Sequence, residues 1–404
     1  MKKKICFVNC SATGSTGNII RNIIKGLETF DFCCILGEKT DWINKSHVLS
    51  IGSTPLSYKI CRTETFLFGN DGFLSIHYKN KILRFLKKEK PDIIHIHNPH
   101  RSFCNLEAIF KFSLKNNIKI VWTLHDLWAF TGRCCTPLEC EGWLKGCGHC
   151  VHKNYFPRVV FDQSSKFYNK KTKLYNMLSE SITFVAPSEW MYRQVDRRLQ
   201  NFKKVIVNNG IDTNIFKPSI GNQEILRCAK NRFVIGAAAL YFNELKGKSA
   251  FINMAKSLDK DKYFFVLIGT ENKEISFFEE NIMFLPKTFS QGEMAAFYNS
   301  LNVFVNPTQT DNFPTTHLES IACGTPVITY DVGGAKEMIV EGETGFAVSL
   351  NDVSAIVEKI NLISNNKEKF DRYKVSSVSD FSLLKFCNQY KDLYLSSLRK
   401  ITIK

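Results

Sequence analysis

Residues 309–346 hold the most restrictive pattern in this chain, in which a polar loop, a helix, a buried strand and a glycine-rich loop follow one another without a break. A proline and two threonines at 314–316 predict that the helix begins near residue 315. Asp311 then lies on the loop before the helix, and Glu319 lies within its first two turns. The free N–H groups of a first helical turn bind anions readily. The stretch therefore predicts an anion-binding α/β unit flanked by two carboxylates.

Predicted strands alternate with amphipathic helices along the rest of the chain. Several strands, such as those at 5–10 and 263–269, are apolar over nearly their whole length. Apolar strands of this kind are typical of parallel sheets that are covered on both faces. The length of 404 residues suggests two or three domains. The predicted fold class is therefore α/β, with two doubly wound, Rossmann-like parallel-sheet domains facing a cleft.

The stretch at 309–346 resembles the donor-sugar site of retaining glycosyltransferases of family 4, which have the GT-B fold. Their pattern is an acid, seven intervening residues and a glutamate. A Cys-Gly-x-Pro-Val segment, here at 323–327, and a Gly-Gly loop, here at 333–334, follow. Asp311 stands where most relatives carry glutamate. The resemblance covers nearly the whole chain.

The resemblance implies which residues hold a nucleotide-sugar. Glu319 would hydrogen-bond the ribose hydroxyls, Lys246 would neutralise the departing diphosphate, and Asp311 would hold sugar hydroxyls. An arginine that relatives carry nearby looks replaced by Ala239, and Lys248 or a residue of the first domain would compensate for it. The further donor-side residues are Phe313, Pro314, Thr315 and Thr316 at the helix start, Lys287 in the expected nucleobase loop, and Gly14 and Gly17 in the first strand-to-helix turn.

Polar side chains also follow two predicted strands of the first half. His97 and Asn98 end the strand that begins at Asp92, and His125 and Asp126 end the strand after residue 118. Ligands of open α/β sheets bind at the carboxyl ends of strands. By resemblance, His125 would contact the donor sugar near the reacting carbon and act with Asp311 and Lys246 as a catalytic residue. His97, Asn98 and Asp126 are expected on the acceptor side, and a purely structural His-Asp pair is the alternative.

The segment 205–218 is similar to the interdomain linker of the family. We therefore expect an acceptor-side domain over 1–205, which includes a cysteine-rich loop at 132–152. A nucleotide-sugar-binding domain is expected over 206–380. Residues 381–404 are expected to form a helix that crosses back to the first domain.

The net charge of +16 lies in the first half of the chain. Residues 1–210 hold 32 Lys and Arg against 16 Asp and Glu, whereas residues 211–404 hold 22 of each. Such an asymmetry predicts an anionic partner for the first half, which is membrane lipid, a diphosphate-bearing acceptor or nucleic acid. Two basic amphipathic helices, at 78–90 and 166–178, are candidates for contact with an anionic membrane, and ordinary surface helices are the alternative.

Five of the fourteen cysteines fall within residues 134–150. Cys134, Cys140, Cys147 and Cys150 have the spacing of a loop that holds one structural zinc ion. A reducing compartment favours metal over disulfides, although paired disulfides and free thiols are alternatives. A similar loop follows the His-Asp strand in family members that assemble bacterial surface polysaccharides, where Gly-His-Cys replaces the Gly-Arg-Cys found here at 132–134.

Together these observations predict an enzyme, a retaining glycosyltransferase that moves a hexose from a UDP- or GDP-linked sugar to a lipid-linked or glycan acceptor. The expected process is the assembly of a surface polysaccharide, such as O-antigen, lipopolysaccharide or capsule. By resemblance, the acceptor hydroxyl attacks from the face of the departing diphosphate, and no cofactor or catalytic metal is required. The apolar run at 5–8 is too short for a signal sequence, so we expect a cytoplasmic protein on the inner face of the membrane.

Two other classes of protein share part of the pattern. Nucleotide-sugar 2-epimerases have the same two-domain architecture and need no acceptor, but a basic first half and a cysteine loop are not expected of them. A zinc-ribbon nucleic-acid-binding protein would account for the charge and the cysteines, but it leaves the motif at 309–346 unexplained. We therefore expect no nucleic-acid partner.

Overall fold

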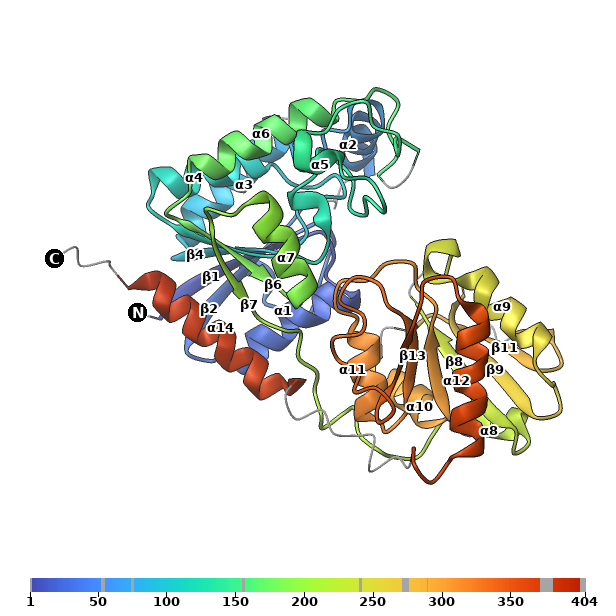
Figure 1. Ribbon diagram of the computed structural model, residues 1–404. Helices are drawn as coiled ribbons and strands as arrows, with labels where there is room; N and C mark the ends of the chain where they lie inside the picture. Colours follow the sequence, from blue (N-terminus) through green and yellow to red (C-terminus); the bar gives the residue numbers. More distant parts are fainter. Residues whose placement is uncertain are drawn as a thin grey trace. The chain divides into compact units, whose positions relative to one another are not determined.

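The computed structural model describes residues 2–51, 55–73, 76–154, 157–239, 242–270, 276–288, 290–370 and 381–399. The chain forms two compact units. Met1–Asn208 and Phe386–Lys404 make up the first unit, and Asn209–Lys385 make up the second (Figure 1). The sequence placed the corresponding boundaries at 205–206 and 380–381.

Seven parallel strands form the sheet of the first unit, in the order β3-β2-β1-β4-β5-β6-β7. They are β1 (Lys3–Asn9), β2 (Phe30–Leu36), β3 (Val48–Ser50), β4 (Ile93–Ile96), β5 (Lys119–Thr123), β6 (Ile182–Ala186) and β7 (Lys203–Ile206). The strand order changes direction between β1 and β4. In open α/β sheets, ligands bind beside such a switch point, at the carboxyl ends of the strands.

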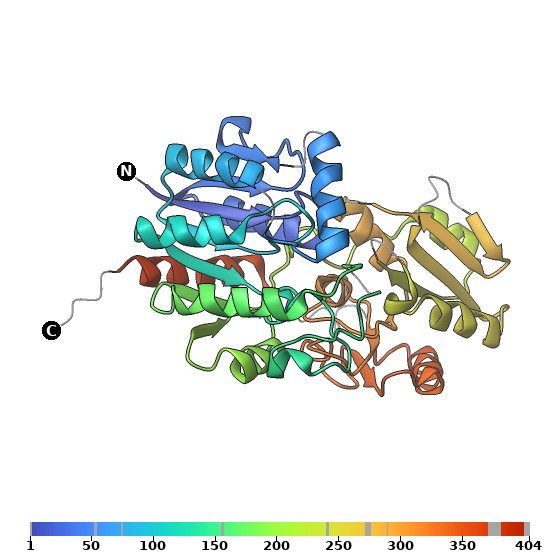
Figure 2. The same cartoon turned by 90° about the horizontal axis from the view of Figure 1, so that it is seen from above.

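Helices cover both faces of this sheet (Figures 1 and 2). They are α1 (Gly14–Gly26), α2 (Pro55–Phe68), α3 (Ile76–Glu89), α4 (Leu106–Lys115), α5 (Gly142–Lys145), α6 (Ser164–Asn176), α7 (Glu189–Arg198) and α14 (Leu383–Leu398), with the 3-10 turns η1 (Lys45–His47) and η3 (Leu127–Ala129). Ser188 caps α7, because its hydroxyl accepts the Met191 N–H at 3.0 Å.

Helix α14 is attached to the first sheet by buried hydrogen bonds. The Tyr394 hydroxyl lies 2.6 Å from Nδ1 of His95, whose Nε2 lies 2.8 Å from the Thr123 hydroxyl. The Tyr390 hydroxyl lies 2.7 Å from the same threonine. These groups are satisfied only when α14 lies against β4 and β5, since a buried polar group without a partner is costly. The network therefore fixes the position of the C-terminal helix.

The second unit also has a seven-stranded sheet, in the order β10-β11-β9-β8-β12-β13-β14. Only the pair β10–β11 is antiparallel. The strands are β8 (Phe233–Ala238), β9 (Tyr263–Thr270), β10 (Ser276–Glu279), β11 (Ile282–Pro286), β12 (Val303–Asn306), β13 (Val327–Tyr330) and β14 (Gly345–Val348). The direction of the strand order changes between β8 and β12, which marks the switch point of this sheet.

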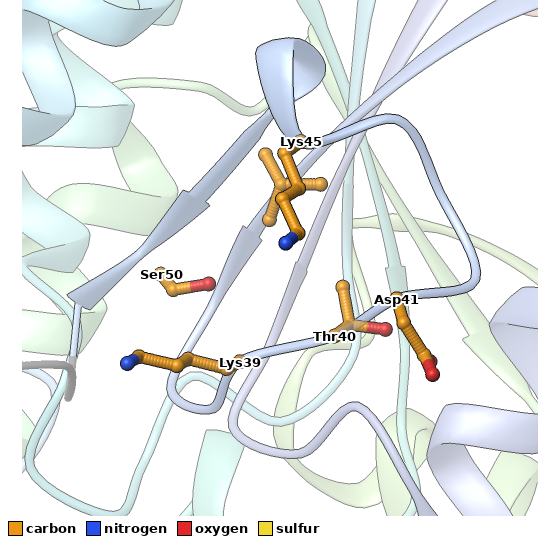
Figure 3. Close-up of a pocket in the computed structure, with 6 residues that line it drawn as sticks. Lys39, Thr40, Asp41, Lys45 and Ser50 are labelled. Atoms are coloured by element: carbon orange, nitrogen blue, oxygen red, sulfur yellow. The ribbon is translucent and has the colours of Figure 1, made fainter.

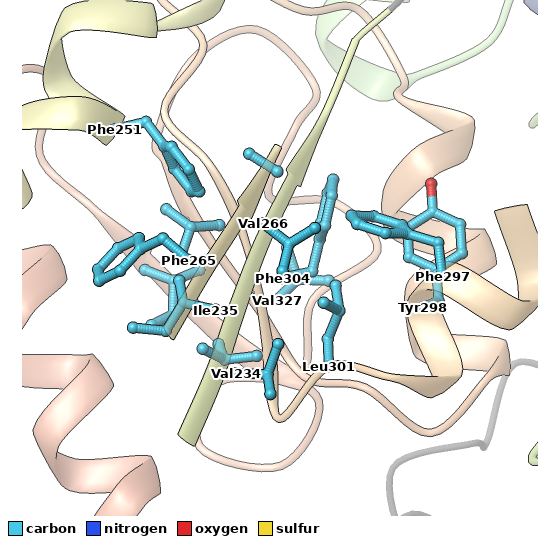
Figure 4. Packing of buried hydrophobic residues seen from close by; sticks show 14 of the residues in the cluster. Val234, Ile235, Phe251, Phe265, Val266, Phe297, Tyr298, Leu301, Phe304 and Val327 are labelled. Atoms are coloured by element: carbon cyan, nitrogen blue, oxygen red, sulfur yellow. The ribbon is translucent and has the colours of Figure 1, made fainter. Parts of the chain in front are cut away.

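The core of the second unit lies on both faces of its sheet. The helices are α8 (Gln223–Ala229), α9 (Lys248–Ser257), α10 (Gln291–Asn299), α11 (Thr315–Ala322) and α12 (Val353–Asn365), with the turn η4 (Glu244–Lys246). Figure 4 shows Phe251 of α9 and Tyr298 of α10 on opposite sides of the central strands. Their rings lie 5.4 Å from those of Phe265 and Phe304, respectively. Helix α11 begins at Thr315, which confirms the predicted start.

The two basic helices that the sequence offers for membrane contact have their apolar faces in the core. In α3, Ile82 and Leu86 are fully buried. In α6, the buried apolar side chains are Phe167, Tyr168, Leu174 and Tyr175. An amphipathic pattern shows which face is apolar but not what covers it, and here the hydrophobic core of the first unit does so. No described helix has the length and the hydrophobicity needed to cross a bilayer.

Candidate active site

Lys246 and Asp311 form an ion pair in the second unit, with Nζ 2.8 Å from Oδ2. Lys246 ends the turn η4 that follows β8, and Asp311 lies on the loop that follows β12. The Gln309 N–H donates to the Leu245 carbonyl at 2.9 Å and holds the two loops together. Two residues predicted to act on the donor therefore meet at the switch point of this sheet.

The Gly-Gly loop after β13 fixes the backbone of Asp311. The Gly334 N–H donates to the Asp311 carbonyl at 3.2 Å. Gly333 has a φ of +57°, and a Cβ there would lie 1.8 Å from the same carbonyl oxygen. Only glycine tolerates both the left-handed backbone and this close approach. The glycine loop is therefore part of the structure that positions the acid.

Glu319 lies in the second turn of α11 and has an unusual environment. The Tyr298 hydroxyl donates to its carboxylate at 3.0 Å. Burial raises the pKa of Glu319 from its usual 4.5 to about 7, and hydrogen bonds from Tyr298 and Thr315 only partly offset this. A carboxylate that can accept further hydrogen bonds is suited to bind two neighbouring hydroxyls of a ligand.

The start of α11 is held from several directions. Thr315 and Thr316 are half-buried, and Pro314 stands at the N-cap. Phe313 is buried, and its carbonyl accepts the side-chain N–H of Asn209 at 3.0 Å. Of these predicted donor residues, Phe313 therefore has a clear packing role, whereas the two threonines keep some contact with solvent.

His317 is a site-supporting residue that the sequence analysis missed. It is fully buried, with Nε2 2.8 Å from the Asn306 side-chain nitrogen and Nδ1 3.0 Å from the Ala335 carbonyl. Burial lowers its pKa to about 4, so it is neutral and donates from Nδ1. It connects α11 to β12 and to the segment after the glycine loop. Its position two residues before Glu319 was the available signal.

The other predicted donor cations lie along the same edge of the second sheet. Lys248 is exposed at the start of α9, directly after Gly247, whose φ is +78°. Lys287 is exposed and follows β11. Ala239 follows β8, and it brings no cation to the place where the resemblance led us to expect an arginine.

In the first unit, the loops after β1 and β4 are joined at the switch point. The Asn9 side-chain oxygen accepts the Asn98 N–H at 3.1 Å, which places Asn98 at this edge. Gly14 is the first residue of α1, with a φ of +70°. Gly17 is buried, and a Cβ there would lie 2.5 Å from the Ala12 backbone. Gly17 therefore allows α1 to pack against the loop.

Glu38 binds to the loop that carries Gly14 and Gly17, which the sequence predicted on the donor side. Its carboxylate accepts the Ser11 hydroxyl at 2.7 Å and the Ala12 N–H at 3.1 Å. The loop thus binds an internal carboxylate, and a phosphate would have to displace it. Glu38 follows β2 at the same sheet edge, so the strand-end rule was the signal that could have found it.

His125 and His97 are stacked and hydrogen-bonded to each other. Their rings lie 5.1 Å apart and nearly parallel, and Nδ1 of His97 is 2.8 Å from Nε2 of His125. His97 is only 1% exposed, and the predicted acceptor-side contact of this residue stays a prediction. The two rings meet because the register of the neighbouring strands β4 and β5 aligns the ends of these strands. His125 itself is half-buried.

Asp126 is hydrogen-bonded rather than open to an acceptor. One carboxylate oxygen lies 2.9 Å from Nε2 of His100, and the other accepts the Trp128 N–H at 2.8 Å. These bonds lower the pKa of Asp126 despite its burial. The ligand atoms of His100, Asp126 and Cys135 lie within 4.8 Å of one another. The His-Asp bond already uses the nitrogen and the oxygen that a metal ion would need.

Lys171 of α6 is a buried cation beside this group. Its Nζ donates to the carbonyls of Trp128 at 2.5 Å and Thr131 at 3.1 Å. Burial lowers its pKa to about 7, which thiol and carboxyl groups nearby only partly oppose. Lys171 thus ties α6 to the start of the cysteine-rich loop.

The cysteine-rich loop is compact, but its sulfurs do not converge on one point. Zinc bound by four thiolates at about 2.3 Å keeps the sulfurs roughly 3.8 Å apart. Among the described residues, no three of the sulfurs of Cys134, Cys140, Cys147 and Cys150 lie within 4.8 Å of one another. All fourteen cysteines are free thiols, so the disulfide alternative is not realised. Zinc stays a prediction, which the metal content of the purified protein would decide.

A pocket of about 620 Å³ lies between the loop that follows β2 and the segment formed by η1 and β3. Its lining comprises Lys39, Thr40, Asp41, Lys45, Val48 and Ser50. Figure 3 shows Lys45 and Ser50 pointing toward the centre of the pocket, whereas the Asp41 carboxylate turns away. Among the described residues, neither Lys39 nor Lys45 forms an ion pair. The pocket is therefore suited to an anionic group.

Family models match both units of the chain. Residues 54–215 match the model described as Glycosyltransferase Family 4, and residues 223–376 match the model described as Glycosyl transferases group 1. Among curated proteins, the chain is similar to the putative colanic acid biosynthesis glycosyl transferase WcaC of Escherichia coli (strain K12). The two are 25% identical over 338 residues, which is 80% of each chain.

Solved structures with a similar fold include enzymes of sugar transfer. Sucrose-phosphate synthase from Thermosynechococcus elongatus has a TM-score of 0.71 and 16% identity, with 98% of this chain and 99% of that chain covered. Anabaena Alr3699/HepE in complex with UDP-glucose has a TM-score of 0.63 and 15% identity, with 97% and 99% covered. At these identities the likeness shows a shared fold.

Proposed function

The chain belongs to the family 4 glycosyltransferases, which have the GT-B fold, and we propose that it transfers a hexose with retention from a nucleotide-sugar to a lipid-linked or glycan acceptor. The proposed role is the assembly of a surface polysaccharide. The similarity to the colanic acid enzyme supports this role.

One observation carries the proposal: Lys246, Asp311 and Glu319 lie around the amino end of α11 at the switch point of the second sheet. A cation and free helix N–H groups are suited to bind a diphosphate. A carboxylate with a raised pKa is suited to bind the ribose hydroxyls, and a second acid is suited to bind the sugar. We infer a UDP- or GDP-linked donor. The UDP-glucose in a solved structure of the same fold supports a UDP-linked sugar.

In the proposed reaction, the acceptor oxygen forms a bond to the anomeric carbon while the bond from that carbon to the diphosphate oxygen breaks. The hydroxyl proton passes to the departing diphosphate, which leaves on the face that the acceptor approaches. Lys246 and the N–H groups of α11 stabilise the charge that develops on the diphosphate. Asp311 and His125 hold sugar hydroxyls. No described residue has to form a covalent intermediate in this scheme.

The pocket of the first unit that is lined by Lys39 and Lys45 supports a lipid-linked acceptor. A lipid-linked sugar carries its glycan on a diphosphate, and Lys39 and Lys45 would neutralise that group. The Ser50 hydroxyl would add a hydrogen bond. We therefore assign this pocket, and not the buried His97, to the acceptor.

We further propose that the first unit lies on an anionic membrane through an exposed apolar patch. The patch consists of Phe66 and Phe68 at the end of α2 with Val160 and Phe161, which are 41–56% exposed. The Phe161 N–H donates to the Leu67 carbonyl at 2.9 Å, and the rings of Phe68 and Phe161 stack at 6.0 Å. The exposed cations within the same segments are Lys59, Arg62 and Arg158. Apolar side chains beside cations fit an anionic lipid surface.

The decisive experiment is a thermal-shift panel of nucleotide-sugars, followed by transfer to a lipid-linked acceptor and analysis of the anomeric configuration by NMR. A ligand that binds only the folded state raises its melting temperature. We expect a shift with one nucleotide family and a product with the configuration of the donor sugar. An inverted product would overturn retention. A 2-epimer formed without any acceptor would instead identify an epimerase.

A further inference from the structure

His97 lies in a closed stack of rings beneath His125. Its ring is 4.2 Å from that of His95 and 5.9 Å from that of Phe7. The Trp122 indole N–H donates to the His97 carbonyl at 3.0 Å. These contacts hold the ring in one orientation, and Nδ1 then meets Nε2 of His125 at 2.8 Å. The pair has no freedom to exchange this contact for another.

Both imidazoles are neutral near pH 7. Burial lowers the pKa of His97 well below 6.5, and it lowers the pKa of His125 to about 4. A neutral imidazole carries one ring proton and one bare nitrogen. The bond between the two rings therefore has one donor and one acceptor, and its direction fixes the tautomer of both residues.

The second nitrogen of His97 decides the direction. Its Nε2 is buried and has no hydrogen-bond partner among the described residues. A proton on Nε2 would be a buried N–H without an acceptor, which folded proteins rarely contain. The proton of His97 therefore lies on Nδ1 and is donated to Nε2 of His125. His125 must then carry its own proton on Nδ1.

Nδ1 of His125 is the nitrogen available to a ligand. It makes no hydrogen bond within the described chain, and the residue is half-buried at the carboxyl end of β5. With the proton on Nδ1, His125 acts as a donor to an oxygen and cannot act as a base at that atom. A sugar hydroxyl oxygen is an acceptor of this kind.

We propose that His97 is a positioning residue, which holds His125 in the Nδ1–H tautomer so that this N–H is presented to a hydroxyl oxygen of the sugar. The proposal rests on the proposed function for the sugar, but the tautomer itself follows from the two rings. A carboxylate or carbonyl that orients a histidine bound to a metal has the same effect on its tautomer.

The test combines two substitutions of His97 with NMR. His97→Phe keeps a ring but removes the donor, whereas the side-chain N–H₂ of His97→Asn takes the place of Nδ1. Thr123→Val is the matched control, because it removes the buried bonds to His95 and Tyr390 and leaves the pair of His97 and His125 intact. Proton–nitrogen spectra of protein labelled with ¹⁵N-histidine report which ring nitrogen carries the proton, and the His125 signals are identified by their loss in His125→Gln.

We expect the wild-type spectrum to show His125 protonated on Nδ1. His97→Phe should mix the two tautomers and lower kcat for sugar transfer about tenfold, the effect of one lost hydrogen bond, with the Kd for the nucleotide unchanged. His97→Asn should retain kcat within about threefold. Thr123→Val should melt at a lower temperature with the His125 signals unchanged.

A proton on Nε2 of His125 in the wild type would overturn the proposal. So would a His97→Phe protein with the wild-type spectrum and kcat. If the spectrum shows Nδ1–H but His125→Gln transfers sugar normally, the assigned role of His125 fails while the tautomer assignment stands. The two failures are therefore distinguishable.

Discussion

Lys246 and Asp311 neutralise each other across 2.8 Å, although 65 positions separate them in the chain. Both side chains are only partly exposed, at 35% and 21%. A diphosphate that approaches Lys246 therefore competes with Asp311 for the same ammonium group. The pair keeps the cation oriented at the switch point before the donor arrives.

Lys246→Gln should weaken the binding of the nucleoside diphosphate about tenfold to hundredfold, because a charge-assisted hydrogen bond contributes about 1.5–3 kcal/mol. Asp311→Asn should have the opposite effect on this binding, since it frees the ammonium group, while it lowers transfer at least about tenfold. Isothermal titration with the nucleoside diphosphate measures the first quantity, and initial rates measure the second. Equal losses of nucleotide affinity in both variants would contradict the competition between carboxylate and diphosphate.

Glu319 should make both stability and donor binding depend on pH around 7. Its pKa is raised in the folded protein, so between 4.5 and about 7 the folded state keeps a proton that the unfolded state has released. Its contribution to the free energy of unfolding therefore falls as the pH rises through this window. Glu319→Gln removes this pH-dependent loss of stability. We expect the free energy of unfolding of the variant to exceed that of the wild type by about 1–2 kcal/mol at pH 8 and to equal it at pH 4.

The same variant should bind the nucleotide less well above pH 7, where the wild-type carboxylate is ionised and accepts the ribose hydroxyls. Wild-type affinity should rise with pH through about 7, and the affinity of Glu319→Gln should stay flat. Urea unfolding and nucleotide titration at several pH values test the two effects separately. A parallel pH dependence of affinity in both proteins would remove Glu319 from the nucleotide site.

The helix start at Thr315 and the alternating strands follow from local signals, since Pro314 and the apolar runs act within a few residues. The ion pair of Lys246 and Asp311 does not follow from local signals, because the order of the strands in the sheet brings these two residues together. Tyr175 in α6 shows the same limit, because its helical pattern reveals an apolar face and not the strand residues Trp122 and Phe184 that cover it. His97 and His125 were placed at strand ends, but their mutual hydrogen bond depends on the register of β4 and β5.

Gly333→Ala should destabilise the second unit by about 2–4 kcal/mol, because the backbone is left-handed and the Cβ would meet the Asp311 carbonyl oxygen. Gly292→Ala is the matched control. Gly292 lies inside α10 with nothing closer than 3.8 Å to its Cβ position, so alanine should stabilise by about 0.5–1 kcal/mol. Urea unfolding of the two variants measures both values. If Gly333→Ala were as stable as the wild type, the glycine loop would be able to move away from the Asp311 carbonyl and would not hold it in a fixed position.

Lys39→Glu combined with Lys45→Glu should raise KM for a lipid diphosphate acceptor about tenfold or more, since both cations of the pocket change sign. KM for the nucleotide-sugar should not change, because the donor residues belong to the other unit. Lys217→Glu combined with Lys230→Glu, which changes two exposed cations of the second unit, controls for the change in net charge. If the double variant also has a raised KM for a neutral disaccharide acceptor, the pocket does not bind the diphosphate specifically.

Phe66→Asp combined with Phe161→Asp should abolish binding to vesicles that contain phosphatidylglycerol. The two rings belong to the exposed patch of the first unit, and each charge would have to enter the lipid interface. Ile220→Asp is the matched control, because this residue is 80% exposed but lies in the second unit, whose segment of the chain carries no excess of positive charge. Co-sedimentation at low and high salt separates the electrostatic from the apolar contribution to vesicle binding. Salt screens the charges of the lysines and arginines but does not weaken the apolar contact. We expect the wild type to bind anionic vesicles at low salt, to bind them less well at high salt and to bind neutral vesicles weakly. Equal loss in Ile220→Asp, or full binding by the double variant, would show that the patch is not the membrane-contacting surface.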